Sequence, residues 1–174
     1  MPVVLDERVR IYRFEPYADH LAVVLSDAEA TEGVFDGDTW DKADEAWRIA
    51  VERHCVVIGT ARYDYVLVKL DIWSAPPVYD PLDAYDHVAE SDVEFPSGKL
   101  TVTGATQVPE QVEPIPVPAG RYRVRVGYLP TGQRPSKFSE TDPGDHLEYR
   151  VTMWPTVEER GVRILKQGSS PWAY

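Results

Sequence analysis

Hydrophobic and polar residues alternate with a period of two along most of the chain, which is the pattern of strands that bury one face. The clearest run covers residues 121–128, with Tyr122, Val124, Val126 and Tyr128 on one face and Arg121, Arg123 and Arg125 on the other. A second run at residues 147–154 alternates in the same way until Pro155 ends it. Both runs predict strands with an apolar inner face.

A third strand is predicted at residues 87–95. Its inner face holds Ala89, Val93 and Phe95, and its outer face holds Glu90, Asp92 and Glu94. Pro96-Ser97-Gly98 is typical of a turn, so residues 100–104 are expected to return as the second strand of a hairpin. Shorter runs predict further strands near residues 9–14, 20–25, 55–61, 65–73 and 162–165.

One segment departs from this pattern and predicts an amphipathic helix at about residues 39–54. Apolar residues recur in it at spacings of three and four: Trp40, Ala43, Trp47, Ala50 and Val51. Acidic residues lie toward its beginning and basic residues toward its end, as the helix dipole favours. We therefore expect Trp47 to lie in the core.

These elements predict a mainly β fold, a two-sheet antiparallel β-sandwich with one inserted amphipathic helix at about 39–54. A chain of 174 residues fits a single domain, which we expect to cover residues 1–174. The 14 residues of 131–144 are rich in Gly, Pro and polar side chains and predict a mobile loop. Residues 168–174 are expected to form a C-terminal tail.

The net charge of −11 restricts the partners of such a domain. Nucleic acids and anionic membrane surfaces repel a negative protein, so neither is an expected partner. The single cysteine, Cys55, allows no intrachain disulfide and no cysteine-based zinc site. No apolar run approaches the length of a membrane helix or matches a signal peptide, so we expect a soluble cytoplasmic protein.

The sequence holds no catalytic motif, and we expect no catalytic residue, no cofactor and no metal. Nucleophile elbows and Gly-rich phosphate loops do not occur, and Cys55 opens an apolar run typical of a buried thiol. An Asp-His pair occurs at residues 19–20, 86–87 and 145–146. A metal site is one interpretation of these pairs. Neighbouring strand residues point to opposite faces, however, which favours simple polar strand starts.

The arginines at 121, 123 and 125 also have two interpretations. They can bind phosphate groups, or they can form a solvated cross-strand ladder with the acidic row of residues 90, 92 and 94. Matching the inner faces of the 121–128 and 147–154 strands would place Arg125 near Arg150 and Arg121 near Trp154. Two facing arginines need acids beside them, which favours the ladder.

Acidic residues concentrate between Asp27 and Glu45, where eight acids accompany one base, Lys42. A solvated loop and helix face is one interpretation of this stretch. The other is a surface that captures a basic protein through carboxylates around an aromatic anchor. The candidate partner-binding residues are Phe35, Asp36, Asp38, Trp40, Asp41, Asp44 and Glu45.

Several motifs within residues 85–155 resemble a group of small bacterial β-sandwich proteins. The motifs are Tyr85-Asp86-His87-Val88-Ala89-Glu90, Pro96-Ser97-Gly98-Lys99-Leu100, Pro118-Ala119-Gly120-Arg121-Tyr122-Arg123-Val124-Arg125, Asp145-His146-Leu147-Glu148-Tyr149 and Met153-Trp154-Pro155. The group is that of competence protein J, an inhibitor of a DNA-entry nuclease, with similar immunity-type proteins of toxin systems. The resemblance implies a cytoplasmic bacterial protein that works by binding. It offers no match for residues 1–84.

The sequence therefore predicts an acidic protein-binding module, not an enzyme, that inhibits a basic partner such as a nuclease or toxin. Inhibition would be by occlusion, with carboxylates in positions that phosphates normally fill. The alternative is a small-molecule-binding or hydrolytic β-sandwich protein, with a site between the sheets or beneath the 131–144 loop. A structural or assembly subunit is a third possibility, for which the sequence offers no positive feature.

Overall fold

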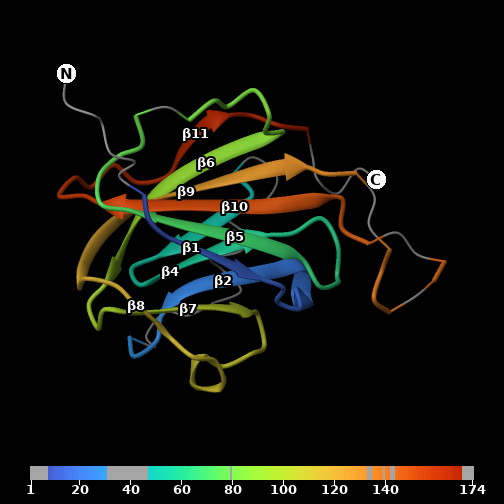
Figure 1. The fold of residues 1–174 in the computed structure, drawn as a ribbon, viewed down its shortest axis with the longest axis horizontal. Coiled ribbons are helices and arrows are strands. Elements are labelled where there is room, and N and C mark those ends of the chain that lie inside the picture. The colour runs from blue at the N-terminus through green and yellow to red at the C-terminus, as the bar shows by residue number, and fades with distance from the viewer. Residues whose placement is uncertain are drawn as a thin grey trace.

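Strands dominate the computed structural model, which describes residues 8–30, 47–78, 80–132, 135–138, 140–141 and 144–169 (Figure 1). The strands are β1 (Arg8–Phe14), β2 (Ala22–Asp27), β3 (Ile49–Glu52), β4 (Cys55–Gly59), β5 (Leu67–Trp73), β6 (His87–Phe95), β7 (Lys99–Gly104), β8 (Ile115–Pro116), β9 (Gly120–Pro130), β10 (Leu147–Pro155) and β11 (Arg163–Lys166). Two 3₁₀ turns, η1 (Asp19–Leu21) and η2 (Pro109–Gln111), are the helical elements of these ranges. No helix in the described ranges is long and apolar enough to cross a membrane.

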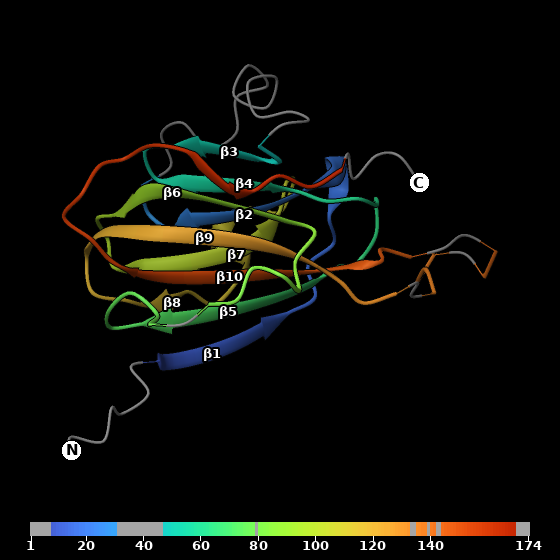
Figure 2. The ribbon, with the colours of Figure 1, turned by 90° about the horizontal axis from the view of Figure 1, so that it is seen from above.

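The strands form two sheets, which Figures 1 and 2 show from two directions. One sheet has the order β1-β5-β10-β9-β6-β11, and the other has the order β3-β4-β2-β7-β8. The predicted strands are confirmed, but the hairpin expected across Pro96-Ser97-Gly98 is wrong. β6 belongs to the six-stranded sheet and β7 to the five-stranded sheet, so this turn connects the two sheets. The prediction that all pairs are antiparallel is wrong for β5 and β10, which run parallel. These two strands are far apart in the sequence, and a long connection between them permits this direction.

The inner faces of both sheets contribute to one hydrophobic core. Val23, Leu25, Val56 and Ile58 come from the five-stranded sheet, and Leu70, Val126, Val151 and Tyr149 come from the six-stranded sheet. The predicted alternation of β9 and β10 is confirmed, because the side chains assigned to their inner faces are all buried. Burial of this apolar area is the main source of stability for such a fold.

The helix predicted at residues 39–54 is wrong where the structure describes it. A hairpin of β3 and β4 occupies residues 49–59. Arg48, just before the hairpin, has a left-handed backbone with a φ of 58°, which a helix does not allow. Trp47 was expected in the core and is instead 39% exposed. Residues 39–46 lie outside the described residues.

The spacing of apolar residues predicted a helix here because β3 is buried on both faces. Ile49 and Val51 pack into the main core, whereas Ala50 joins a smaller cluster on the other face of the sheet with Cys55 and Val57. A short strand with two apolar faces has no period-two pattern, so its residues fit helical spacing equally well.

Arg48 connects the edge of the five-stranded sheet to the other sheet. Its side chain is fully buried, and its Nη1 donates to Oδ2 of Asp86 at 2.8 Å. Its guanidinium lies over the ring of Tyr128 on β9, 5.2 Å from the ring centroid. The Tyr128 hydroxyl in turn donates to the backbone carbonyl of Arg48 at 2.6 Å. These contacts hold the start of β3 against the six-stranded sheet.

His87, at the start of β6, is fully buried beside this contact. Its Nδ1 lies 3.1 Å from the backbone amide of Gly168, which can only donate, so Nδ1 accepts. Its Nε2 lies 2.9 Å from the carbonyl of Trp47, which can only accept, so Nε2 carries the proton. These bonds fit the neutral imidazole. Burial lowers the pKa of His87, and the nearby charge of Arg48 lowers it further.

We expect the fold to lose stability as the pH falls below about 6.5, the ordinary pKa of histidine. Below that pH the unfolded chain binds a proton at His87 that the folded chain does not, so acidification favours unfolding. Between pH 7.5 and 5.5, His87→Gln should lose about 1 kcal/mol less stability than the wild type. Urea denaturation at the two pH values measures this difference.

The matched control is His20→Asn, which removes an exposed histidine and keeps a residue that tolerates its left-handed backbone. This variant should lose as much stability as the wild type over the same pH interval. Equal losses for His87→Gln and the wild type would contradict the assignment of the pH dependence to His87.

Candidate partner-binding site

The seven predicted partner-binding residues, Phe35, Asp36, Asp38, Trp40, Asp41, Asp44 and Glu45, all lie within residues 31–46, outside the described residues. Their placement stays a prediction. The structure does describe the start of the same acidic stretch. Asp27, its first acid, is the last residue of β2, and Glu29, its second acid, lies two residues further along the chain.

Asp27 is fully buried and has a structural role. Its Oδ1 accepts the backbone amides of Glu29 and Ala30, each at 2.9 Å, and its Oδ2 accepts the amide of Ser97 at 2.9 Å. The Ser97 hydroxyl also donates to Oδ1 at 2.7 Å. Burial alone would raise the pKa of Asp27, but these hydrogen bonds outweigh it and leave the pKa lowered. This carboxylate ties the end of β2 to the β6–β7 turn.

Glu29 is about half exposed and forms an ion pair with Lys99 of β7. The bond to Glu29 raises the pKa of Lys99. The first two acids of the stretch are therefore engaged within the protein. The other six acids lie in residues 31–46, together with one lysine.

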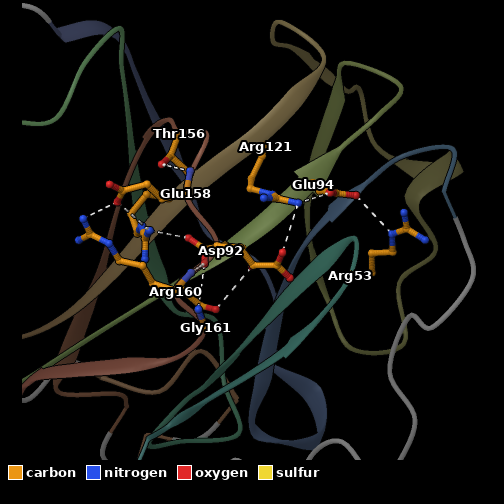
Figure 3. A network of polar contacts seen from close by, with 11 residues as sticks. Arg53, Asp92, Glu94, Arg121, Thr156, Glu158, Arg160 and Gly161 are labelled. Atoms are coloured by element: carbon orange, nitrogen blue, oxygen red, sulfur yellow. Dashed lines mark hydrogen bonds and ion pairs between the residues drawn. The ribbon is translucent and has the colours of Figure 1, made fainter.

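A ladder of three acid–arginine pairs crosses from β6 to β9. Figure 3 shows part of it, with Asp92, Glu94 and Arg121 labelled. The pairs are Glu90–Arg125 at 3.1 Å, Asp92–Arg123 at 2.9 Å and Glu94–Arg121 at 2.9 Å. We refer to these six residues as the charge ladder. The pairing between the acidic and basic rows is confirmed.

The register between β9 and β10 differs from the expected one by two residues. Arg123 lies opposite Trp154, and Arg125 lies opposite Thr152. Arg150 lies opposite Gly127, so none of these arginines face each other. A shift of two keeps the inner faces matched, which is why alternation alone did not distinguish the two registers.

The sequence suggested that the whole charge ladder is solvated. In the structure its three pairs differ in exposure. In the middle pair the side chains of Arg123 and Asp92 are only 3% and 7% exposed. At the outer end Glu94 accepts from Arg121 and from Arg53, whose side chain is 79% exposed. These two donors lower the pKa of Glu94. Water is therefore excluded most completely at the middle pair, where a low dielectric makes a given charge separation count most.

The connection from β10 to β11 covers the middle pair. Oδ2 of Asp92 accepts the backbone amides of Arg160 and Gly161, the latter at 2.9 Å (Figure 3). Glu158 forms an ion pair with Arg160, and its Oε2 lies 3.9 Å from Nη2 of Arg123. This segment thus adds Glu158, a fourth acid, and Arg160, a fourth arginine, beside the charge ladder.

A hollow of about 680 Å³ opens beside the charge ladder on the outer face of the six-stranded sheet. Trp154 and Pro155 supply apolar surface, and Arg123 and Arg125 supply charge. The Arg125 guanidinium lies 5.2 Å from the centroid of the Trp154 ring, and its Nη1 donates to Asp80 at 2.7 Å. The hollow can bind a charged group with an apolar neighbour.

The three Asp-His pairs are separate in the structure. Asp19 accepts from the amide of Thr106, Asp86 binds Arg48, and Asp145 accepts from the hydroxyl of Tyr149 at 2.7 Å. Burial raises the pKa of Asp145 despite its hydrogen bonds. Within the part of the chain that the structure describes, no three His, Cys, Asp or Glu side chains are placed to hold a metal ion.

An exposed group of aromatic rings was not predicted. We call Tyr17, Tyr63, Tyr65 and Phe138 the aromatic patch. Tyr17 lies within 5.0–5.4 Å of the other three ring centroids, and Tyr65 stacks on Phe138 at 5.5 Å. Tyr63 and Phe138 are 54% and 59% exposed. The rings come from three separate connections, so no periodicity reveals them. The available signal was aromatic residues between predicted strands, at the start of the 65–73 strand and in the predicted 131–144 loop.

The fold has counterparts among solved structures, although no family model and no curated protein sequence matches the chain. The crystal structure of ComJ, inhibitor of the DNA degrading activity of NucA, from Bacillus subtilis, is similar with a TM-score of 0.59 and 11% identity. The match covers 86% of this chain and 97% of ComJ.

A second structure, described as crocagin biosynthetic gene J, has a TM-score of 0.55 and 19% identity. That match covers 84% of this chain and 97% of the other. At these identities the likeness concerns the fold. The resemblance first drawn from residues 85–155 is thus confirmed as one of architecture, and it extends well beyond those residues.

The charge ladder generates a stability prediction. Arg123→Met should cost ~3–5 kcal/mol, because it leaves the carboxylate of Asp92 buried without its counter-ion. Arg53→Met removes an exposed partner of Glu94 and should cost less than ~1 kcal/mol. Urea denaturation of both variants measures the difference. Similar small losses for the two would mean that the middle pair is not electrostatically coupled as its burial implies.

Proposed function

We propose that this protein is a protein-binding inhibitor, not an enzyme, and that its partner is a nuclease or a similar basic protein. The observation that carries the proposal is the distribution of charge. On the described surface, arginines engage the carboxylates of the charge ladder. Residues 31–46 hold six acids and one lysine, and so account for much of the net charge of −11.

The likeness to ComJ supports the inhibitor class. ComJ inhibits the DNA-degrading activity of NucA, and the two chains share a fold over 86% of this chain. A binding protein needs a stable scaffold that presents a surface, and a two-sheet core supplies one without requiring catalytic groups. The likeness supports a nuclease as the partner class for this chain.

The proposed mechanism is occlusion of a basic nucleic-acid-binding surface. Asp36, Asp38, Asp41, Asp44 and Glu45 would take the positions that phosphates occupy, and Phe35 or Trp40 would provide an apolar anchor. Opposite charges on the two proteins would raise the rate of encounter at low salt. The aromatic patch is a second candidate for the anchor, because Tyr63 and Phe138 are already exposed.

A second candidate function is the binding of a small molecule. The space between the sheets is filled by core side chains such as Tyr128 and Tyr149. The hollow beside the charge ladder, at about 680 Å³, has a size usual for ligand pockets. The candidate site for a small molecule is therefore this hollow on the outer face of the six-stranded sheet, and not the space between the sheets.

The test of inhibition is DNA degradation by NucA, and by a panel of other basic nucleases, in the presence of the purified chain. We expect inhibition of at least one nuclease. The variant Asp36→Lys/Asp38→Lys/Asp41→Lys/Asp44→Lys should slow association at least ~10-fold. Raising the salt from 0.05 M to 0.5 M should slow the wild type more than this variant, because salt screens the remaining attraction.

The matched control reverses four exposed acids elsewhere: Asp83→Lys/Glu110→Lys/Glu113→Lys/Glu159→Lys. It makes the same change in net charge and should retain most of the association rate. Absence of binding to every nuclease tested would contradict the proposal. Equal slowing by both quadruple variants would show that net charge, and not residues 36–44, governs association.

The aromatic patch is tested in the same assay with Tyr63→Ala/Phe138→Ala. We expect this double variant to dissociate from the inhibited nuclease at least ~10-fold faster, because clustered exposed aromatics dominate binding energy at interfaces. Val78→Ala, at a side chain that is 85% exposed and outside the patch, is the control and should behave as the wild type. Unchanged dissociation of the double variant would leave residues 35 and 40 as the anchor.

A further inference from the structure

Arg123 has an unmet requirement for hydrogen-bond acceptors. A guanidinium carries five N–H donors, and leaving them unpaired in a buried position is costly. The residue is 2% exposed, yet neither Nη1 nor Nη2 makes a hydrogen bond. Oδ1 of Asp92 lies 2.9 Å from Nη2 but is not aligned with an N–H, and it too makes no hydrogen bond. The pair is held by charge alone.

The hollow of about 680 Å³ lies against this side chain. Arg160 lines the same hollow. The carboxylate of Glu158 is within ion-pair distance of both arginines. Oε2 of Glu158 is ion-paired with Nη2 of Arg160 and lies 3.9 Å from Nη2 of Arg123. Two guanidinium groups thus approach one carboxylate oxygen, which is the arrangement of a carboxylate-binding site.

We propose that this hollow binds the carboxylate group of a ligand between Arg123 and Arg160. Glu158 is an internal substitute for that carboxylate and turns outward when the ligand enters. Its side chain is 53% exposed, so this movement removes little buried contact. Neighbouring Val157 is 96% exposed and does not anchor the segment either.

The charges around the hollow favour a singly charged carboxylate. Arg123, Arg125 and Arg160 line it together with Glu90 and Glu158. With Glu158 turned outward, two of these three arginines face the ligand, because Arg125 is engaged by Glu90 and Asp80. Asp92 offsets part of the charge of Arg123, so a doubly charged phosphate would be less well balanced than a carboxylate.

The apolar lining indicates what the carboxylate is attached to. Trp154 and Pro155 line the hollow on the side of the sheet, and Pro76 lines it from the connection between β5 and β6. An aromatic or aliphatic group next to the carboxylate can pack against them. A small organic acid and the Asp or Glu side chain of a partner protein share this chemistry. The inference does not depend on the proposed inhibition of a nuclease.

In the experiment each probe is titrated into the full chain, and ¹H–¹⁵N NMR monitors the signals of the Arg123 Nε–H and the Trp154 indole N–H. The probes are phenylacetate, the blocked peptide acetyl-Ala-Ala-Glu-Ala-Ala-amide, its Gln counterpart, phenylacetamide and inorganic phosphate. We expect saturable shifts of both signals with phenylacetate or the Glu peptide, and none with the two neutral probes. Tighter binding of the peptide would assign a protein carboxylate, and tighter binding of phenylacetate a small acid.

Variants of exposed residues test the substitute role without disturbing the core. Glu158→Ala removes the competing carboxylate and should tighten binding of the better probe by ~3–10-fold. Glu159→Ala is the matched control, because Glu159 is a neighbouring exposed acid that pairs with Arg121 and not with Arg123. It should leave the affinity unchanged. Arg160→Gln should weaken binding by about tenfold.

Three results would overturn the proposal. Shifts from phenylacetamide equal to those from phenylacetate would show that the carboxylate is not recognised. Tighter binding of phosphate than of either carboxylate would refute the class of ligand. Equal affinities of Glu158→Ala and Glu159→Ala would refute the role of Glu158. Thermal melting of each variant verifies that it is folded, so a negative result is not a failure to fold.

Discussion

The burial of charge on β9 is the constraint on which the rest of this structure depends. β9 lies inside the six-stranded sheet between β10 and β6, and its inner face fills the core with tyrosine and valine. Its outer face carries three arginines, of which Arg123 is almost completely buried. A buried guanidinium is tolerated only with an adjacent negative charge, and Asp92 of β6 supplies it. The order of strands in this sheet is therefore also a requirement of charge pairing.

That pairing also affects how charge is distributed over the rest of the chain. A protein with a net charge of −11 can either spread its acids over the surface or neutralise most of them locally. Here the outer face of β6 and β9 is locally neutralised, and Asp27 and Glu29 are engaged by Ser97 and Lys99. Residues 31–46 hold six acids and one lysine, so a large part of the remaining negative charge lies in one stretch of the sequence. A concentrated charge steers a partner toward one surface, which a uniformly acidic protein does not.

The sequence predicted the strands and the charge ladder because both rest on period-two alternation, which a strand with one buried face produces directly. The same rule failed at β3, where Ile49 and Ala50 are buried on opposite faces and a left-handed Arg48 begins the hairpin. The register of β9 on β10 was wrong by two because alternation repeats every two residues. The aromatic patch and the position of Glu158 depend on connections that are far apart in the sequence and adjacent in the structure. A local sequence pattern does not predict such contacts.

The parallel pairing of β5 with β10 has a consequence for how the chain folds during synthesis. Leu67 pairs with Glu148, so about 80 residues separate the two strands in sequence. Until β10 has left the ribosome, β5 has β1 on one side and an open row of backbone hydrogen-bonding groups on the other. Such long-range closure slows folding and exposes the nascent chain to association with other chains. β10, which is synthesised late, thus covers the open edge of β5, which is synthesised early. A chain that ends before β10 would leave this edge unpaired and prone to aggregation.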